Sequence, residues 1–209
     1  MNPGVIQNRS LIDFGVATRP LAGQTVSGDL HLVTPINHGV LLAAVDGVGH
    51  GEEATAAAQM AVAILEKHAQ ESVISLVKRC HEALTKTRGV VMTLASLNAF
   101  ENTITWLGVG NVEGLILRAD ANATHPSEGV LLRGGLVGYQ LPTLQANVIP
   151  VAPGDLLVFA TDGIRDDFPE GLTPTESPQQ IADRILNRYL KGNDDALVLV
   201  ARFLGIKNE

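Results

Sequence analysis

Hydrophobic residues recur along the chain with the two periods that distinguish strands from helices. Apolar or alternating runs predict strands at 12–18, 29–34, 39–45, 89–97, 102–109, 112–118, 154–161 and 195–203. Apolar positions at helical spacing predict helices at 52–69, 72–86 and 176–190. The stretch from 120 to 153 is rich in glycine, proline and polar residues, and short strands are expected there near 130–132 and 146–151.

Three of the predicted strands follow one another closely in the middle of the chain. Gly110 and Asn111 separate the runs 102–109 and 112–118 by two residues, which is a hairpin signal of the reversed Gly-Asn type. We therefore expect these two runs and the strand at 89–97 to form a three-stranded meander.

The order of elements indicates an α+β fold. Strands at both ends of the chain surround a central pair of helices, and the helix at 176–190 stands alone. Two sheets packed together, with helices outside, would accommodate this order. The 209 residues contain no repeat, low-complexity tract or linker-like stretch, so we expect residues 1–209 to form a single domain.

Composition excludes several classes of protein. The formal net charge of −7 argues against a nucleic-acid binder or a polybasic membrane binder. The only cysteine, Cys80, excludes an internal disulfide framework and a cysteine-rich zinc site. The sequence has no secretory signal pattern and no apolar run of about 18 residues, so we expect a cytoplasmic protein without a transmembrane helix.

Aspartates stand beside four of the predicted strands. Asp29 opens one strand, Asp46 and Asp162 each end an apolar run, and Asp194 and Asp195 precede the last strand. An uncompensated carboxylate beside a buried strand is costly, and several converging carboxylates repel one another. A hard divalent cation such as Mg²⁺ or Mn²⁺ removes both problems, because it prefers oxygen ligands.

The alternative for each aspartate is a plain turn residue or strand terminator. That interpretation is the better one for any single aspartate, whereas the four together favour a cation site. Gly47 and Gly163 follow two of the aspartates, and their missing side chains would let a backbone carbonyl or a bound water approach.

Four short motifs carry a resemblance to a known family. In chain order they are SGD (27–29), AAVDGVGHG (43–51), FATDGIRDDF (159–168) and GNDDALVLV (192–200). This set resembles the PPM (type 2C) metal-dependent protein serine/threonine phosphatases, in their SpoIIE/RsbU-like bacterial branch, over roughly residues 10–204. The tetrapeptides KTRG (86–89) and VGNV (109–112) further resemble the small RsbX-type feedback phosphatases of the stressosome.

The resemblance implies an αββα sandwich of two antiparallel sheets with helix pairs outside and metals at one end between the sheets. It implies two Mn²⁺ or Mg²⁺ ions, with Asp46 bridging them, the carbonyl of Gly47 helping to bind one, and Asp162 and Asp194 holding the second. Asp29 would be a direct or water-mediated partner. Asp46 and Asp162 would then be catalytic through a metal-bound water, which would lose a proton near neutral pH and attack phosphorus in line.

Some positions depart from the larger members of the family. Their proposed general acid, a histidine directly after the first Asp-Gly, is replaced by Val48. His50 stands two residues later and is expected mainly to shape the loop, as Asp195 and Gly163 are expected to support the site rather than to make it. The family's phosphate-binding arginine has no clear match, and the candidates are Arg9, Arg19 and Arg165.

The predicted function is hydrolysis of phosphoserine or phosphothreonine on a protein. The RsbX-type resemblance implies phosphorylated STAS-domain scaffold proteins of a stressosome as partners, with dephosphorylation resetting the signal. The alternatives are an RsbU/SpoIIE-like phosphatase of an anti-anti-sigma factor and a non-catalytic phosphoprotein-binding module. We expect a monomer, and we expect the polar loop at 163–178 to border the site and to contribute to selectivity.

Overall fold

Two β-sheets facing each other form the centre of the computed structural model, which describes residues 11–120, 122–172 and 174–206. In spatial order the first sheet contains β1 (Ile12–Arg19), β11 (Ala196–Phe203), β10 (Leu156–Ala160), β6 (Glu113–Leu117) and β7 (Ser127–Gly129). The second contains β2 (Asp29–Ile36), β3 (Gly39–Gly47), β4 (Val90–Asn98), β5 (Thr103–Val109) and β8 (Leu132–Arg133), and β9 (Asn147–Pro150) also pairs with β5. The pairing is antiparallel except between β5 and β8.

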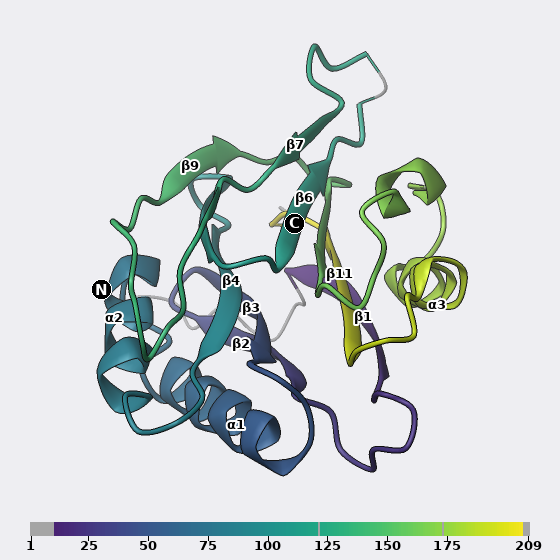
Figure 1. Cartoon of the computed structure of the whole chain (residues 1–209). Coiled ribbons are helices and arrows are strands. Elements are labelled where there is room, and N and C mark those ends of the chain that lie inside the picture. The colour runs from purple at the N-terminus through teal and green to yellow at the C-terminus, as the bar shows by residue number, and fades with distance from the viewer. Residues whose placement is uncertain (1–10, 121, 173, 207–209) are drawn as a thin grey trace.

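Helices cover the outer face of each sheet, which makes four layers (Figure 1). The helices α1 (Glu52–Lys67) and α2 (Val73–Ala83) pack against the second sheet. The helix α3 (Pro178–Tyr189) and the short 3-10 helix η1 (Phe168–Gly171) pack against the first sheet. The αββα architecture is therefore confirmed, but the outer layer over the first sheet holds one α-helix among the described residues rather than the expected pair.

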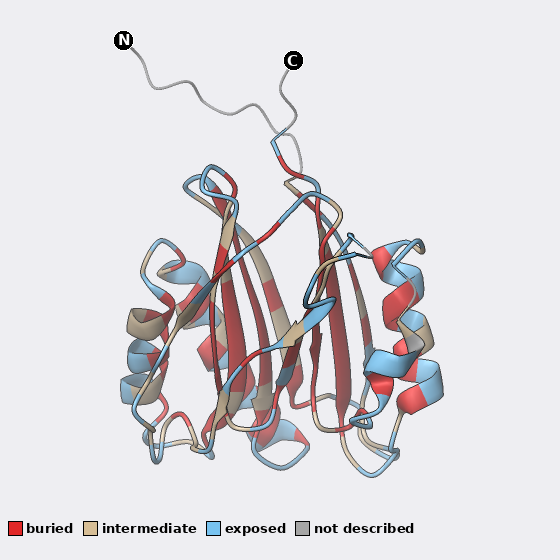
Figure 2. Cartoon of the chain, turned by 90° about the horizontal axis from the view of Figure 1, so that it is seen from above, coloured by how far each residue is buried: buried red, intermediate tan, exposed pale blue. Residues whose placement is uncertain are grey.

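The apolar runs of the sequence are strands buried on both faces. Along β3, Leu42 and Ala44 face the other sheet, whereas Leu41, Ala43 and Val45 face α1 and α2. Figure 2 shows the resulting concentration of buried residues in the two central layers. This double burial explains why β3 carries an unbroken apolar run instead of an alternating pattern.

The helices begin and end close to the predicted positions. Ser72 caps α2 by accepting a hydrogen bond from the backbone N–H of Ser75. Ser177 and Gln180 form a capping box at the start of α3, with Pro178 in its first turn. No helix in the described parts of the chain is both long enough and apolar enough to cross a membrane.

The predicted meander is wrong. Strands β4 and β5 pair, but β6 joins the other sheet, where it pairs with β10 and β7. The chain crosses between the sheets at Gly110, whose φ is 94° and whose N–H donates to the carbonyl of Arg133. The buried hydroxyl of Thr93 donates to the carbonyl of Val112 at 2.6 Å and holds the crossing. A local hairpin signal is thus overridden by partners distant in the sequence.

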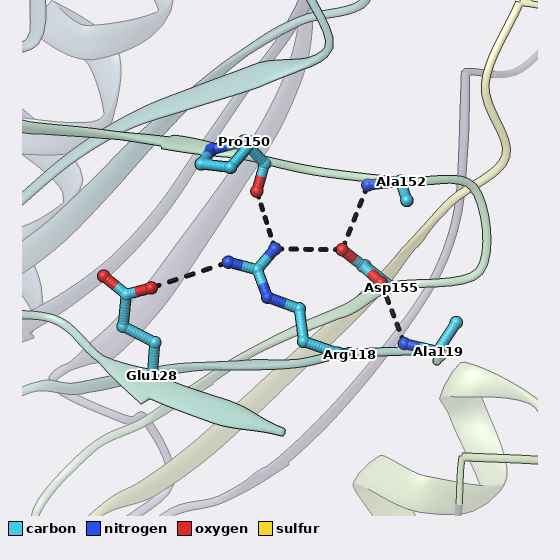
Figure 3. Close-up of polar contacts among 6 residues, drawn as sticks. All are labelled: Arg118, Ala119, Glu128, Pro150, Ala152 and Asp155. Carbon is cyan, nitrogen blue, oxygen red and sulfur yellow. Dashed lines mark hydrogen bonds and ion pairs between the residues drawn. The ribbon is translucent and has the colours of Figure 1, made fainter. Parts of the chain in front are cut away.

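An ion pair between Arg118 and the buried Asp155 closes one end of the sandwich (Figure 3). Arg118 donates to Asp155 at 3.0 Å and to the carbonyl of Pro150 at 2.6 Å. Asp155 is 4% exposed, and its two oxygens also accept backbone N–H groups from Ala119 at 2.8 Å and from Ala152 at 3.0 Å. These contacts join the segment after β6 to the turn before β10.

Substituting Asp155→Ala should destabilise the fold by about 3 kcal/mol, because it leaves a half-buried guanidinium without its main partner. Urea denaturation would measure the loss. The control is Asp13→Ala, since Asp13 is an exposed aspartate of β1 and its removal should cost less than about 0.5 kcal/mol. Equal stability of the two variants would contradict the assignment.

Candidate metal centre

The acidic strand ends meet at the end of the sandwich opposite the Arg118 ion pair. Asp29 begins β2 and lies directly opposite Asp46 near the end of β3. Asp46 continues the inter-sheet face of β3 because it has the same parity as Leu42 and Ala44. Asp162 directly follows Thr161 at the end of β10, and Asp194 and Asp195 precede β11. Segments far apart in the sequence thus bring all the predicted carboxylates to one place.

Thr161 ties Asp29 to the other sheet. Asp29 is 3% exposed, and its carboxylate accepts a hydrogen bond from the Thr161 hydroxyl at 2.7 Å. The same hydroxyl oxygen accepts the backbone N–H of Leu197 at 2.8 Å. One buried side chain therefore fixes the first carboxylate relative to β10 and β11.

Asp46 lies at the electrostatic centre of the group. Within the described residues its half-buried carboxyl has no hydrogen bond or ion pair. Burial raises its pKa to about 9, with further contributions from the charges of Asp29, Asp162, Asp194 and Asp195. Burial also raises the pKa of Asp29, to about 7, although the hydrogen bond from Thr161 opposes the rise.

Asp162 is held by a residue that the sequence analysis did not assign to the site. The side-chain amide of Asn111 donates to Asp162 at 2.8 Å. Burial and the charge of Asp194 raise the pKa of Asp162, whereas Asn111 and Lys191 lower it. Asn111 follows the crossing between the sheets, and the sequence marked it only as part of the Gly-Asn hairpin signal and of the VGNV tetrapeptide.

Asp194 and Asp195 have different surroundings. Asp195 is 2% exposed, and its two oxygens accept the backbone N–H groups of Leu21 and Gly28, each at 2.7 Å. Asp195 therefore fastens the segment leading into β2. Asp194 is less buried and accepts only the N–H of Asp195 among the described contacts, which leaves oxygen lone pairs available.

The two glycines beside the aspartates are required by backbone packing. A Cβ at Gly47 would lie 2.2 Å from the carbonyl oxygen of Ala54 in α1. A Cβ at Gly163 would lie 2.0 Å from the carbonyl oxygen of Asp195. Of the two close approaches expected at these positions, that of a backbone carbonyl or of a bound water, the structure shows a backbone carbonyl at both glycines.

The remaining candidates from the sequence are His50 and three arginines, and none of those described is held by the aspartates of the cluster. His50 is exposed, and its nearest polar contact is a 3.5 Å approach to Gln24. Arg19 is hydrogen-bonded to Asn187, and Arg165 to Asp167, while Arg9 lies outside the described residues. The guanidinium of Arg88, which sequence analysis did not consider for this role, lies against Gly49 in the loop after Asp46.

A hard divalent cation fits this set of donors. Throughout residues 11–120, 122–172 and 174–206, no three His, Cys, Asp or Glu side chains form a ready-made ligand set. Mg²⁺ and Mn²⁺ do not need one, because Mg²⁺ commonly keeps several waters and binds through one or two carboxylates. Burial, with the neighbouring negative charges, keeps the pKa of Asp46 and Asp29 high, and a bound cation would offset the cost of ionising them.

The model of the family "Stage II sporulation protein E (SpoIIE)" matches residues 37–204. The chain belongs to the SpoIIE family. This assignment confirms the predicted PPM-type phosphatase domain, and by family the chain is a protein phosphatase. The match spans three of the motifs that suggested it, from AAVDGVGHG to GNDDALVLV.

Two protein relatives support the assignment to the SpoIIE family. The phosphoserine phosphatase RsbX of Bacillus subtilis (strain 168) is 22% identical over 179 residues, which cover 85% of this chain and 87% of RsbX. The stage II sporulation protein E of Priestia megaterium is 24% identical over 92% of this chain, but the match spans only 36% of that longer protein.

Solved structures share the fold of the SpoIIE-family chain. A chain from a study of the bacterial stressosome as a modular signalling system is 28% identical, with a TM-score of 0.83 over 91% of this chain and 99% of that one. The structure of RsbX in complex with magnesium is 20% identical, with a TM-score of 0.82 over 94% and 97% of the two chains.

Stability of the metal-free protein should fall as the pH rises. At pH values where the unfolded chain has lost the protons of Asp46 and Asp29, the folded protein still holds them. Folding therefore binds protons between the ordinary aspartate pKa of 3.8 and the raised pKa values, which are about 7 for Asp29 and about 9 for Asp46. In chelator, urea denaturation from about pH 5 to about pH 8 should show a loss of more than about 1 kcal/mol.

The variant Asp46→Asn should flatten this dependence, because an amide cannot ionise. Saturating Mn²⁺ should remove it in the wild-type protein by binding the ionised carboxylates. A wild-type and an Asp46→Asn profile of the same slope would show that the acidic cluster is not the cause.

Proposed function

We propose that this chain is a metal-dependent phosphatase that hydrolyses phosphoserine or phosphothreonine on STAS-domain scaffold proteins of a stressosome. The observation that carries the catalytic part is the convergence of Asp29, Asp46, Asp162 and Asp194 at one end of the sandwich. At its centre is the Asp46 carboxyl, which has no hydrogen-bond or ion-pair partner among the described residues. The convergence also weighs against a binding module without turnover, since such a module has no need of it.

The residues proposed to hold two Mn²⁺ or Mg²⁺ ions are Asp29, Asp46, the carbonyl of Gly47, Asp162 and Asp194. Bound there, the metals supply an activated water nucleophile and offset negative charge on the phosphoryl oxygens. Thr161 and Asn111 orient two of these carboxylates through their hydrogen bonds. Asp195 is proposed to support the site without holding a metal, because its carboxylate fixes the backbone at Gly28, directly before Asp29.

The stressosome assignment rests on similarity to RsbX, which extends over most of both chains. Similarity to a chain from the stressosome structural study supports the same choice. The family match and the relative from Priestia megaterium favour a second candidate, a SpoIIE-like phosphatase of an anti-anti-sigma factor. Either substrate corresponds to a cytoplasmic location, and a monomer remains our proposal for the state of the enzyme.

The loop expected to select substrates, 163–178, extends over two environments. Its first residues lie beside Asp162, where Gly163 accepts the N–H of Lys191 and Arg165 donates its N–H to Tyr189. Its later part is held near the opposite end of β11, where Arg202 donates to the carbonyls of Pro174 and Glu176. We therefore limit the proposed contribution to selectivity to the first few residues; Thr173 lies outside the described residues.

The decisive experiment measures phosphate release from phosphorylated STAS-domain proteins with Mn²⁺, with Mg²⁺ and with excess chelator. The wild-type protein should be active only with metal, and Asp46→Asn should lose at least about 10³-fold in kcat/KM, as expected for removal of a metal-holding carboxylate. Comparing scaffold with anti-anti-sigma substrates decides between the two candidates.

Asp13→Asn is the matched control, since it removes an exposed carboxylate of β1 away from the acidic cluster. It should leave turnover unchanged. Well-folded, metal-loaded protein that releases phosphate from no phosphoprotein would favour the binding module instead.

His50→Ala should lower kcat by less than about tenfold, because His50 is exposed and weakly held. A general acid would contribute about 10²- to 10⁴-fold. Steady-state kinetics across pH, with His125→Ala as an exposed-histidine control, would measure this. A loss above about a hundredfold, with the alkaline limb of the pH profile removed, would identify His50 as the proton donor.

A further inference from the structure

A short hairpin projects at the metal end of the second sheet. It lies between β8 and β9, beside α2 (Figure 1). Leu136 and Gln140 exchange backbone hydrogen bonds of 2.8 and 2.9 Å, and Gly138 and Tyr139 form the tip. Gly138 has a φ of 101°, which suits a tight turn.

Strand register places this hairpin and the loop that follows Asp46 on opposite sides of the start of β4. Val137 pairs with Val90, and Val90 pairs with Gly47 on its other side. The next residue after Gly47 continues this pairing, because the N–H of Val48 donates to the carbonyl of Gly89 at 3.2 Å. On the other side of Gly89, a Cβ at Gly138 would lie 3.2 Å from the Gly89 Cα. The hairpin therefore runs parallel to β3 and passes the end of the sheet where the loop after Asp46 begins.

Tyr139 is presented to solvent from a fixed support. Its exposed fraction is 82%, whereas Tyr189, the other tyrosine, is 3% exposed. Two hydrogen bonds to Val90 hold the hairpin, and Nδ1 of His81 in α2 accepts the N–H of Gly138 at 3.0 Å. A large side chain on a rigid backbone loses little conformational entropy when it is covered.

The surface between the hairpin and the Asp46 loop has a mixed character. Val48 in that loop is 38% exposed. Arg88, which directly precedes Gly89, lies against Gly49, and its side chain is 49% exposed while paired with Glu53. Val48 and Arg88 therefore lie at the start of the Asp46 loop, and the hairpin that carries Tyr139 lies on the other side of Gly89 at the same end of the sheet. Tyrosine and arginine are enriched at protein interfaces.

We propose that Tyr139 is a docking residue for the phosphoprotein substrate, with Val48 and Arg88 completing the surface that it contacts. This rests on the proposed function, because the occupant is the folded protein surface around the phosphorylated side chain. The net charge of −7 and the acidic cluster at the same end disfavour a nucleic acid or an anionic membrane as the occupant.

Phe100 provides a matched control. An exposed aromatic residue on its own has no functional meaning, since many surface residues are apolar. Phe100 is 56% exposed in the turn between β4 and β5, at the end of the sandwich away from the aspartates, and it packs edge-on against His38. What distinguishes Tyr139 is that its hairpin pairs with the start of β4, at the end of the sheet where the aspartates lie.

The test compares the wild-type protein, Tyr139→Ala and Phe100→Ala on two substrates, a phosphorylated STAS-domain protein and p-nitrophenyl phosphate. Tyr139→Ala should lower kcat/KM for the phosphoprotein about tenfold or more, mainly through KM. It should leave hydrolysis of p-nitrophenyl phosphate within about twofold of wild type, and Phe100→Ala should change neither substrate.

Equal losses on both substrates would assign Tyr139 to support of the metal centre and would overturn the proposal. Kinetics unchanged on both substrates would also overturn it. These outcomes differ from a failure of the proposed function, in which the wild-type protein itself would release no phosphate from the phosphoprotein.

Discussion

The burial of several mutually repelling carboxylates between two apolar sheets is the constraint on which this structure depends. The sandwich brings Asp29, Asp46 and Asp162 together where water is partly excluded, and no cationic side chain contributes to the shifts at Asp29 and Asp46. Without a metal, burial and the neighbouring negative charges raise the pKa of Asp46 to about 9 and that of Asp29 to about 7. A divalent cation would resolve the conflict, because the electrostatic cost that opposes folding without metal would favour metal binding.

The contacts that fix the acidic end are arranged around this requirement. Thr161 joins Asp29 to β10 and β11, and Asp195 joins the start of β11 to the segment before β2. Each contact spans the two sheets or connects distant parts of the chain, so the carboxylates cannot separate unless the sandwich itself opens. The Arg118–Asp155 pair closes the other end, and both ends are thus held by polar contacts around an apolar middle.

Sequence patterns predict those features that depend on burial. The spacing of hydrophobic residues predicts the doubly buried β3 and the amphipathic α2 and α3. The aspartates are recognisable in the sequence because they interrupt apolar runs. Pairing at Gly110 was mispredicted because a two-residue hairpin signal contains no information about β10, the strand that β6 joins. Thr161 and Asn111 were not assigned because a hydrogen bond between segments 51 or 132 residues apart leaves no local pattern.

Chemistry and selectivity have different structural requirements in such an enzyme. The proposed metal-holding carboxylates would act on a phosphoryl group that every phosphoprotein shares, so they could not distinguish one protein from another. Discrimination needs surface that contacts the rest of the substrate, close enough to the metals for both contacts to form at once. The hairpin at Tyr139 meets both conditions, because strand pairing with Val90 fixes its distance from Gly47 while leaving its tip in solvent. A change at that tip can therefore alter partner choice without disturbing the charge balance on which hydrolysis depends.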